Sequence, residues 1–291
     1  MGSVAGKTVF ITGGARGVGA EVARRLHGKG ARLVLTDLDA APLEELADTL
    51  GADDVHTILA DVRDLGAMES AAASAVDRFG GIDIVVANAG IVTYGSVLQV
   101  DPQAFRTLLD VNVMGVFHTV RATLPSVIDR RGYVLIVSSL AAYTAAPGLA
   151  PYNAAKAAVE QFANAVRLEV GHRGVDVGSA HMSWIDTPLY RDTKADLSVF
   201  AEMLTRLPFP LNKTTSVESC GEAFVSGIEN RRRQVNCPGW VGALRWLKPL
   251  LSTRVGERPV AEFVPELLPR MDAEVVALDR SVSCRTAELE G

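Results

Sequence analysis

Short apolar runs alternate with amphipathic segments along most of the chain. In the clearest runs nearly all successive positions are apolar, which is typical of strands buried on both faces of a parallel sheet. The runs lie at 8–11, 32–36, 55–59, 82–87, 133–137 and 175–180, with a shorter one at 234–236. Segments with helical spacing separate them, at 18–27, 42–50, 67–79, 102–128, 152–170 and 217–228. The pattern predicts a doubly wound α/β domain with a parallel sheet, the Rossmann fold.

The pattern changes at residue 238. Segment 240–251 interleaves Trp and Leu with Arg and Lys, and no Gly/Ser-rich linker separates it from the preceding part. We therefore expect one domain over residues 5–237, followed by a helical extension over residues 238–291. Apolar stripes are usually buried, so we expect this one to form a flap over the substrate cleft or to contact a neighbouring subunit. The alternative is binding to a membrane interface. Residues after about 273 are polar and are expected to fray.

Composition and charge exclude several classes of protein. The chain has 291 residues, of which 48% are hydrophobic, enough for a sizeable core. Acidic residues outnumber basic ones by 34 to 29, which argues against nucleic-acid binding despite the arginine run at 231–233. Cys220, Cys237 and Cys284 are far apart, so we expect neither a disulfide framework nor a metal site. With no signal peptide and no long apolar run, we expect a cytoplasmic protein without membrane contact.

Glycines follow the first predicted strand with the spacing G-x-x-x-G-x-G. Gly13, Gly17 and Gly19 lie between this strand and the helical segment that includes Val18. At the N-terminus of a helix, such a turn lets backbone N–H groups approach a pyrophosphate. A glycine-rich turn alone is weak support, but this placement between strand and helix predicts a dinucleotide-binding site.

Two charged residues give opposite indications about the cofactor. Asp37 follows the second strand, where a carboxylate accepts hydrogen bonds from the adenosine ribose and repels a 2′-phosphate. Arg16, within the glycine turn, could pair with that phosphate, or cover the adenine, or face solvent. We weigh Asp37 more heavily because it would lie against the ribose, so NAD is favoured over NADP. Further candidate cofactor contacts follow the third and fourth strands, where ligands bind in open α/β sheets: Asp61, Val62, Asn88, Ala89 and Gly90.

A tyrosine and a lysine are one turn apart on the predicted helix 152–170. Tyr152 and Lys156 therefore share a face of that helix. A lysine in this position stabilises the phenolate and lowers the tyrosine pKa. Ser139 follows the fifth strand, and its hydroxyl could hold a substrate oxygen near Tyr152. Asn112 lies on the preceding helical segment. The four residues predict proton-transfer chemistry beside a bound dinucleotide.

In this order, the motifs resemble those of the short-chain dehydrogenase/reductase family. The resemblance spans about residues 5–237 and rests on the T-G-x-x-x-G-x-G turn, Asn-Ala-Gly at 88–90, and the residues Asn112, Ser139, Tyr152 and Lys156. Members of this family are commonly dimers or tetramers, so the resemblance also implies a homo-oligomer.

The resemblance implies a role for each of the four residues. Tyr152 would exchange a proton with the hydroxyl or carbonyl oxygen of the substrate. Lys156 would bind the nicotinamide ribose and lower the pKa of Tyr152. Ser139 would polarise the carbonyl, and Asn112 would hold a water molecule of the proton relay. Ser138 competes with Ser139, but the spacing to Tyr152 favours Ser139 and leaves Ser138 packed under the strand end.

One stretch after the sixth strand departs from the family pattern. Met182 and Ser183 stand where family members usually have Pro-Gly, so a loop of different shape is expected there. Ile185 and Thr187 remain in place to bind the nicotinamide carboxamide. We expect His181 to be packed or hydrogen-bonded instead of serving as a catalytic base.

The segment 187–210 is expected to cover the substrate. It is rich in Leu, Phe, Tyr and Met and carries no arginine cluster, which favours a hydrophobic secondary alcohol or ketone, steroid- or lipid-like. Candidate substrate contacts, besides Ser139 and Tyr152, are Tyr143, Trp184 and Tyr190. The function predicted is therefore NAD-dependent oxidation or reduction of a small-molecule substrate. The alternatives are an NADPH-dependent carbonyl or 3-oxoacyl reductase and, from another class, a non-catalytic dinucleotide-sensing protein, which would not need the proton-relay residues.

Overall fold

A parallel seven-stranded sheet with the order β3-β2-β1-β4-β5-β6-β9 forms the centre of the molecule. The computed structural model describes residues 2–51 and 53–290. The strands of this sheet are β1 (Thr8–Thr12), β2 (Arg32–Asp37), β3 (Val55–Leu59), β4 (Ile84–Ala87), β5 (Tyr133–Val137), β6 (Asp176–Met182) and β9 (Gln234–Cys237). The chain leaves β1 toward β2 and β3, and returns to the other side of β1 with β4. Ligands bind beyond the carboxyl ends of the strands at such a switch point.

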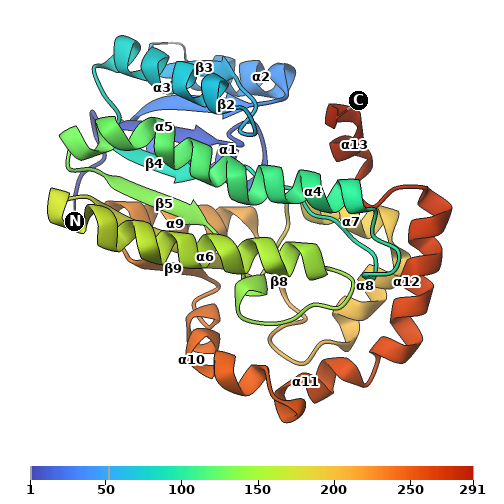
Figure 1. The fold of residues 1–291 in the computed structure, drawn as a ribbon. Helices are drawn as coiled ribbons and strands as arrows, with labels where there is room; N and C mark the ends of the chain where they lie inside the picture. Colours follow the sequence, from blue (N-terminus) through green and yellow to red (C-terminus); the bar gives the residue numbers. More distant parts are fainter. Residues whose placement is uncertain (1, 52, 291) are drawn as a thin grey trace.

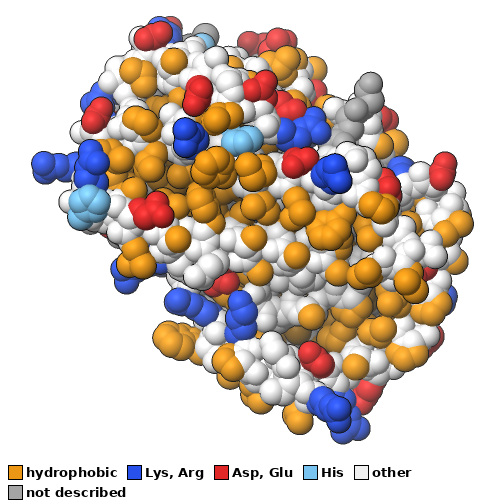
Figure 2. All heavy atoms as spheres, in the orientation of Figure 1, with side chains coloured by type: hydrophobic (Ala, Val, Ile, Leu, Met, Phe, Trp, Pro, Cys, Tyr) orange, Lys and Arg blue, Asp and Glu red, His pale blue; other side chains and the backbone are white. Residues whose placement is uncertain are grey.

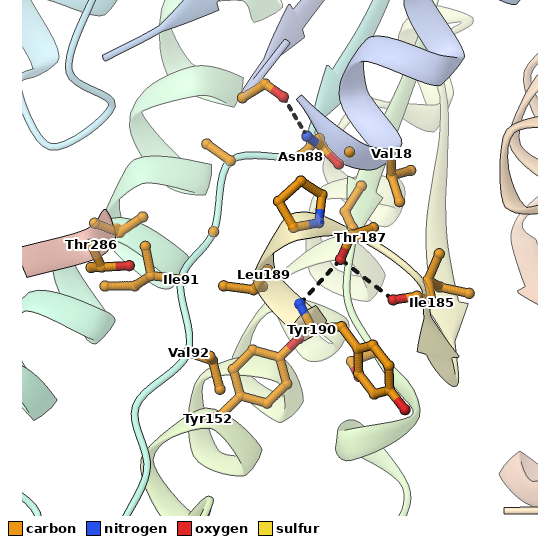
Figure 3. A pocket seen from close by; sticks show the side chains of 18 of the residues that line it. Val18, Asn88, Ile91, Val92, Tyr152, Ile185, Thr187, Leu189, Tyr190 and Thr286 are labelled. Carbon is orange, nitrogen blue, oxygen red and sulfur yellow. Dashed lines mark hydrogen bonds between the residues drawn. The ribbon is translucent and has the colours of Figure 1, made fainter. Parts of the chain in front are cut away.

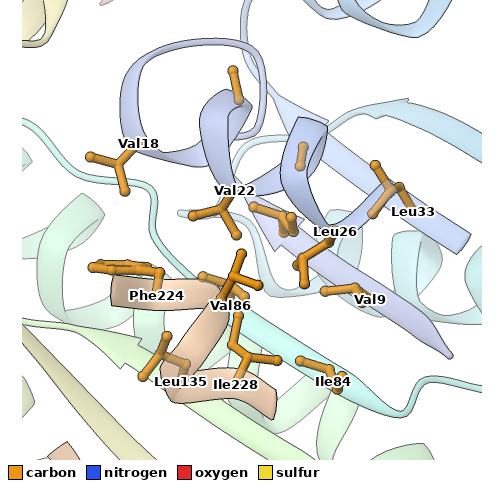
Figure 4. Close-up of a cluster of buried hydrophobic side chains, with 14 of the residues drawn as sticks. Val9, Val18, Val22, Leu26, Leu33, Ile84, Val86, Leu135, Phe224 and Ile228 are labelled. Atoms are coloured by element: carbon orange, nitrogen blue, oxygen red, sulfur yellow. The ribbon is translucent and has the colours of Figure 1, made fainter. Parts of the chain in front are cut away.

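Helices cover both faces of the sheet (Figure 1). They are α1 (Gly17–His27), α2 (Ala40–Leu50) and α9 (Val217–Glu229) on one face, and α3 (Leu65–Phe79), α5 (Gly115–Asp129) and α6 (Ala150–Val170) on the other. Successive strand residues point to opposite faces, so Val9 packs with the first group and Phe10 with the second. Figure 4 shows the first of these cores, where side chains of α1 and α9 meet those of the strands. The predicted Rossmann fold is confirmed.

The helical segment predicted over 102–128 is present and contains a π-helical turn. The segment consists of α4 (Pro102–Leu109) and α5, joined by a π-helical turn over Asp110–Met114. Its Asn112 is fully buried and bonds to the backbone of Ile91 in the loop after β4. Single π turns inside helices often lie at functional sites. Apolar spacing cannot distinguish this turn, because it inserts a residue without interrupting the helical pattern.

Beyond β6 the chain forms a second layer of short elements beside the sheet. These are β7 (Trp184–Ile185), α7 (Pro188–Asp196), α8 (Ser198–Arg206), β8 (Thr214–Thr215), α10 (Val241–Leu251), α11 (Arg254–Ala261), α12 (Val264–Leu278) and α13 (Cys284–Glu290). Helices α8 and α12 share a buried cluster with residues of the loop after β4. None of the described helices is both long and apolar enough to cross a membrane. Lys and Arg side chains are scattered among Asp and Glu on the face shown in Figure 2.

Helix α10 leaves most of its Trp/Leu stripe exposed: Trp246 is 80% exposed, and only the start of the helix packs, around Tyr143. Contact of this stripe with a neighbouring subunit stays a prediction. The predicted fraying after residue 273 is contradicted. Helix α12 continues to Leu278, and the next residues pair with the loop after β4, where Thr93 and Val282 form a β-bridge.

Candidate active site

A pocket of about 390 Å³ lies over the carboxyl ends of the strands. Figure 3 places Val18 and Asn88 toward one end of it and Tyr152 and Tyr190 toward the other. Most of the residues singled out from the sequence line this pocket: Gly13, Arg16, Gly17, Val18, Asp37, Asp61, Val62, Asn88, Ala89, Gly90, Ser139, Tyr152, Lys156, Trp184, Ile185, Thr187 and Tyr190. Within the described chain, Gly19, Asn112 and Tyr143 are not part of the lining.

The glycine turn is packed so closely against the loop after β4 that side chains would not fit. A Cβ on Gly13, whose φ is +62°, would lie 2.9 Å from the Cα of Ala89. A Cβ on Gly19 would lie 2.1 Å from the carbonyl oxygen of Gly13. The Asn88 amide ties the two loops together by donating to the carbonyl oxygens of Thr12 and Gly13, each at 3.0 Å. This cradle at the N-terminus of α1 suits the close approach of a pyrophosphate.

Two carboxylates lie at the end of β2, next to the cradle. Asp37 accepts hydrogen bonds from the backbone N–H groups of Ala15, at 3.0 Å, and Leu38, at 2.9 Å. Arg16 pairs with Asp39 at 2.7 Å. Asp39 was not among the residues expected from the sequence, although its position two residues after Asp37 was the available signal. The Arg16 guanidinium is paired with Asp39, so its positive charge is offset. The remaining carboxylate, Asp37, would repel a 2′-phosphate, so the two carboxylates favour a ribose without a phosphate.

Tyr152, Lys156 and Ser139 meet at the other end of the pocket. The Lys156 Nζ is 5.5 Å from the centroid of the Tyr152 ring and donates to the Val137 carbonyl oxygen at 3.0 Å. Burial raises the pKa of Tyr152, and a hydrogen bond with Ser139 acts in the opposite direction. Helix α6 supplies the tyrosine and the lysine, and the end of β5 supplies the serine. The arrangement can hold an oxygen atom and exchange a proton with it.

Ser138 and His181 have the structural roles expected of them. Ser138 is fully buried, and its hydroxyl donates to the Lys156 carbonyl oxygen at 2.8 Å. His181 is also buried and lies 3.0 Å from the Ser179 hydroxyl. Burial lowers the pKa of His181 to about 4. The expectation that both residues are packed and hydrogen-bonded is confirmed.

The Asn112 side chain is engaged with the backbone of Ile91. Its Oδ1 accepts from the Ile91 N–H at 2.8 Å, and its Nδ2 donates to the Ile91 carbonyl at 2.9 Å. A Cβ on Gly90 would lie 3.2 Å from Asn112 Oδ1 and 3.5 Å from Lys156 Nζ. Asn112 therefore lies directly behind the pocket wall and fixes the loop after β4 next to Lys156.

The three aromatic residues expected to contact substrate occupy different places. Tyr143 is buried away from the pocket, with its ring stacked on His181 at 4.5 Å, so the expectation that it lines the cleft is wrong. Trp184 and Tyr190 do line the pocket, and both pack edge-on against Phe200. Trp184 also donates to the Leu211 carbonyl oxygen at 2.9 Å. The rings form a rigid apolar wall beside Tyr152.

Replacement of Lys156 by methionine is expected to raise thermal stability at neutral pH. Burial lowers the pKa of Lys156 from 10.5 to about 8, so the folded protein holds the ammonium at a free-energy cost of about 3 kcal/mol at most. Between the two pKa values the unfolded chain binds more protons, and wild-type stability therefore rises with pH there. We expect Lys156→Met to melt above the wild type at pH 7, although the Val137 carbonyl loses its donor.

Thermal denaturation across this pH range tests the sign of the effect. The difference in Tm between Lys156→Met and wild type should shrink as the pH rises from 8 to 10.5. Lys213 is exposed, and Lys213→Met is the matched control, for which no such trend is expected. If the Tm difference between Lys156→Met and wild type grew with pH, burial of the Lys156 ammonium would not be the cause of the stability difference.

Part of the pocket wall comes from residues that the sequence analysis did not single out. Ser283, Arg285, Thr286 and Leu289 line the pocket from the C-terminal end of the chain. Their segment is short and polar, and its hydrophobic pattern gave no signal. Their place in the wall depends on long-range contacts with α7 and with the loop after β4.

Comparison with known proteins gives a consistent result. The family model described as short chain dehydrogenase matches residues 7–198. An uncharacterized NAD-dependent oxidoreductase of Mycobacterium tuberculosis is 35% identical over 218 residues, which cover 69% of this chain and 79% of the relative. Oxidoreductase UcpA of Salmonella typhimurium is 33% identical over 242 residues, covering 79% of this chain and 91% of the relative.

A solved structure is similar over most of the sheet and its helices. The crystal structure of a 3-ketoacyl-(acyl-carrier-protein) reductase from Brucella melitensis, complexed with NADH, matches with a TM-score of 0.72 and 26% identity. The match covers 80% of this chain and 97% of that chain. With the family model spanning most of the chain, the chain belongs to the short-chain dehydrogenase/reductase family.

Proposed function

We propose that the protein is an NAD-dependent oxidoreductase that interconverts a hydrophobic secondary alcohol and the corresponding ketone. The observation that carries this proposal is a single pocket with a glycine cradle toward one end and Ser139, Tyr152 and Lys156 toward the other. The carboxylates of Asp37 and Asp39 support NAD over NADP. So do the NAD-dependent relatives from Mycobacterium tuberculosis.

The residues present fit a bound nicotinamide dinucleotide. In this proposal, the cradle around Gly13 would hold the pyrophosphate, Asp37 the adenosine ribose and Lys156 the nicotinamide ribose. Ile185 and Thr187 would face the carboxamide. The cofactor supplies hydride acceptance or donation, while the protein supplies orientation and electrostatics.

Tyr152 would exchange a proton with the substrate oxygen. During oxidation, its phenolate oxygen takes the hydroxyl proton of the alcohol, and during reduction the phenol returns it. Ser139 would donate a hydrogen bond to the same oxygen. The Lys156 ammonium beside the ring favours the phenolate and so opposes the effect of burial on the pKa of Tyr152.

Asn112 would act as a positioning residue for this site. Both groups of its side-chain amide bond to Ile91, so a relay water, as the family resemblance implies, would have to use another atom of this residue. The buried amide fixes the loop that separates the cradle from the catalytic end.

The lining around the catalytic end supports an apolar substrate. It is formed by Trp184, Tyr190 and Phe200, together with Val92, Leu149 and Leu189. Apart from Lys156, the charged side chains that line the pocket belong to the cofactor end or to the pair between Asp192 and Arg285. Such a wall favours a hydrocarbon group over a phosphate or carboxylate.

A screen of secondary alcohols tests the proposal. Linear and cyclic alcohols of increasing size would be offered with NAD⁺ and with NADP⁺, and reduced nicotinamide would be followed by absorbance. We expect turnover with NAD⁺ and a kcat/KM that rises with apolar size. Preference for hydroxy acids or sugars would contradict the substrate class, and binding of NADH without turnover of any alcohol or ketone would favour a dinucleotide sensor.

A reductase of 3-oxoacyl thioesters is the second candidate. It is favoured by the likeness to the Brucella melitensis 3-ketoacyl-(acyl-carrier-protein) reductase complexed with NADH. The same assay, run as oxidation of NADH or NADPH with a 3-oxoacyl thioester, separates the two candidates. A kcat/KM for the thioester that exceeds the value for simple ketones would favour the reductase.

A further inference from the structure

Residues close to the C-terminal end of the described chain form one side of the pocket. We call residues 280–290, which include α13, the C-terminal segment. It supplies Ser283, Arg285, Thr286 and Leu289 to the lining. Figure 3 places Thr286 beside Ile91, across the pocket from Ile185. The segment lies outside residues 7–198, which match the family model, so it is a feature of this chain beyond the matched part.

An ion pair fastens the start of this segment to α7. The Arg280 guanidinium binds both carboxylate oxygens of Asp196, each at 2.8 Å. Tyr94, from the loop after β4, donates to the same carboxylate at 2.8 Å. Both charged side chains are mostly buried, with 22% and 14% of their surface exposed. Bidentate pairs of this kind fix geometry as well as adding energy.

Further contacts join the segment to both sides of the cleft. Arg285 pairs with Asp192 of α7 at 3.0 Å. On the other side, the Tyr94 N–H donates to the Ser281 carbonyl oxygen at 2.9 Å, and the Asp101 N–H donates to the Ser281 hydroxyl at 3.0 Å. The segment therefore bridges α7 and the loop after β4, both of which contribute residues to the pocket lining.

The polar groups that the C-terminal segment contributes to the pocket lining are already paired within the protein. Thr286 is 7% exposed, and its hydroxyl is paired with the Ser283 hydroxyl at 3.0 Å. Its methyl group and the Leu289 side chain are left to contact a ligand. Arg285 is paired with Asp192, so the charge that it presents to a ligand is offset by a neighbouring carboxylate.

We infer that the C-terminal segment is part of the substrate-binding site, and that Leu289 and Thr286 limit the length of the apolar group that fits. This inference rests on the proposed function, since it assigns the part of the pocket that receives a group carried by the reacting carbon. The substrate would carry an uncharged hydrocarbon group there. The ion pair of Arg280 with Asp196 holds the wall in place.

A series of 2-alkanols from 2-butanol to 2-decanol, oxidised with NAD⁺, tests the inference. Leu289→Trp narrows the pocket and should reduce kcat/KM for 2-decanol by about tenfold, while the value for 2-butanol stays within about twofold. Glu288→Gln is the matched control, because Glu288 is exposed on the same helix and is not among the lining residues. It should leave the whole series unchanged. Equal changes across the series, or a loss of NADH affinity in Leu289→Trp, would overturn the inference.

Arg280→Met tests the anchor. Releasing the segment should raise KM for 2-decanol several-fold with little change in kcat, and Arg280→Lys should restore part of the effect. The same KM in Arg280→Met as in wild type would show that the anchored wall does not contact substrate.

Ligand binding separates a failure of this inference from a failure of the proposed function. If the wild type oxidises no alcohol, the proposed function fails. The inference is then tested by ligand binding: 2-decanone is added to each protein in the presence of NADH, and the shift in Tm is measured. Stabilisation of wild type and Glu288→Gln, but not of Leu289→Trp, would still support the wall. Equal stabilisation of the three proteins, or of none, would overturn it.

Discussion

Tyr152→Phe is expected to reduce turnover by about 10²- to 10⁴-fold, the usual contribution of a positioned acid or base. The substitution removes one oxygen atom and keeps the ring that Lys156 approaches at 5.5 Å. NADH affinity should therefore stay within about twofold of wild type. Steady-state oxidation of the best alcohol, with fluorescence titration of NADH on the same preparation, measures both quantities.

Tyr143→Phe is the matched control for this experiment. Tyr143 is buried and is not among the residues that line the pocket, so the loss of its hydroxyl oxygen should leave turnover unchanged. The pH profile gives an independent signature. Oxidation needs the Tyr152 phenolate, so the wild-type rate should rise with pH, and the residual rate of Tyr152→Phe should lack this limb. Near-normal turnover in Tyr152→Phe would refute the acid/base role.

Asp37→Asn is expected to weaken selection for NADH over NADPH by about 10- to 100-fold. The charged carboxylate would accept two ribose hydroxyl hydrogen bonds, of which asparagine can accept one, and the loss of one hydrogen bond to a charged group costs about 1.5–3 kcal/mol. Asparagine keeps the shape and an acceptor for the Ala15 N–H, which bonds Asp37 at 3.0 Å. The loss should fall on NADH, while NADPH gains from the removal of a like charge near its phosphate.

Two further variants make this result specific. Asp39→Asn frees Arg16 from its pair at 2.7 Å and should raise NADPH affinity further when combined with Asp37→Asn. Asp48→Asn changes the net charge equally at an exposed position of α2 and should leave both affinities unchanged. An unaltered ratio of NADH to NADPH affinity in Asp37→Asn would mean that this carboxylate does not face the ribose.

The sheet could be predicted from the sequence because its strands are buried on both faces. Runs such as 33–35 and 133–137 are apolar at successive positions, and the observed strands Arg32–Asp37 and Tyr133–Val137 contain them. The candidate site was predictable for a related reason. In a parallel sheet, residues that follow different strands come together at one edge, which brought Asp37, Asn88 and Ser139 into one pocket.

The parts that were not predictable depend on contacts between distant segments. The π-helical turn over Asp110–Met114 is a change in backbone hydrogen bonding within a helical segment, and the side chain of Asn112 on this turn bonds to Ile91 in a different loop. The C-terminal segment is ordered by Asp196 and Tyr94, far away in the sequence, although its own composition suggested fraying. Conversely, the apolar stripe of α10 suggested burial, yet Trp246 remains exposed.

Several expectations remain predictions. These are the homo-oligomeric state, the cytoplasmic location and the separation of the chain at residue 238. The separation at residue 238 does not separate the site, because Thr286 and Leu289 of the extension line the same cavity as Tyr152. The extension therefore contributes to the site that the first 237 residues build.

The binding of reduced cofactor to the wild-type protein tests the central claim most directly. Titration with NADH and, separately, with NADPH, followed by nicotinamide fluorescence, requires no knowledge of the substrate. The cradle around Gly13 and the carboxylates of Asp37 and Asp39 predict saturable binding, with NADH at least about tenfold tighter than NADPH. Tighter binding of NADPH, or no binding of either, would contradict the proposal that this pocket serves an NAD-dependent oxidoreductase.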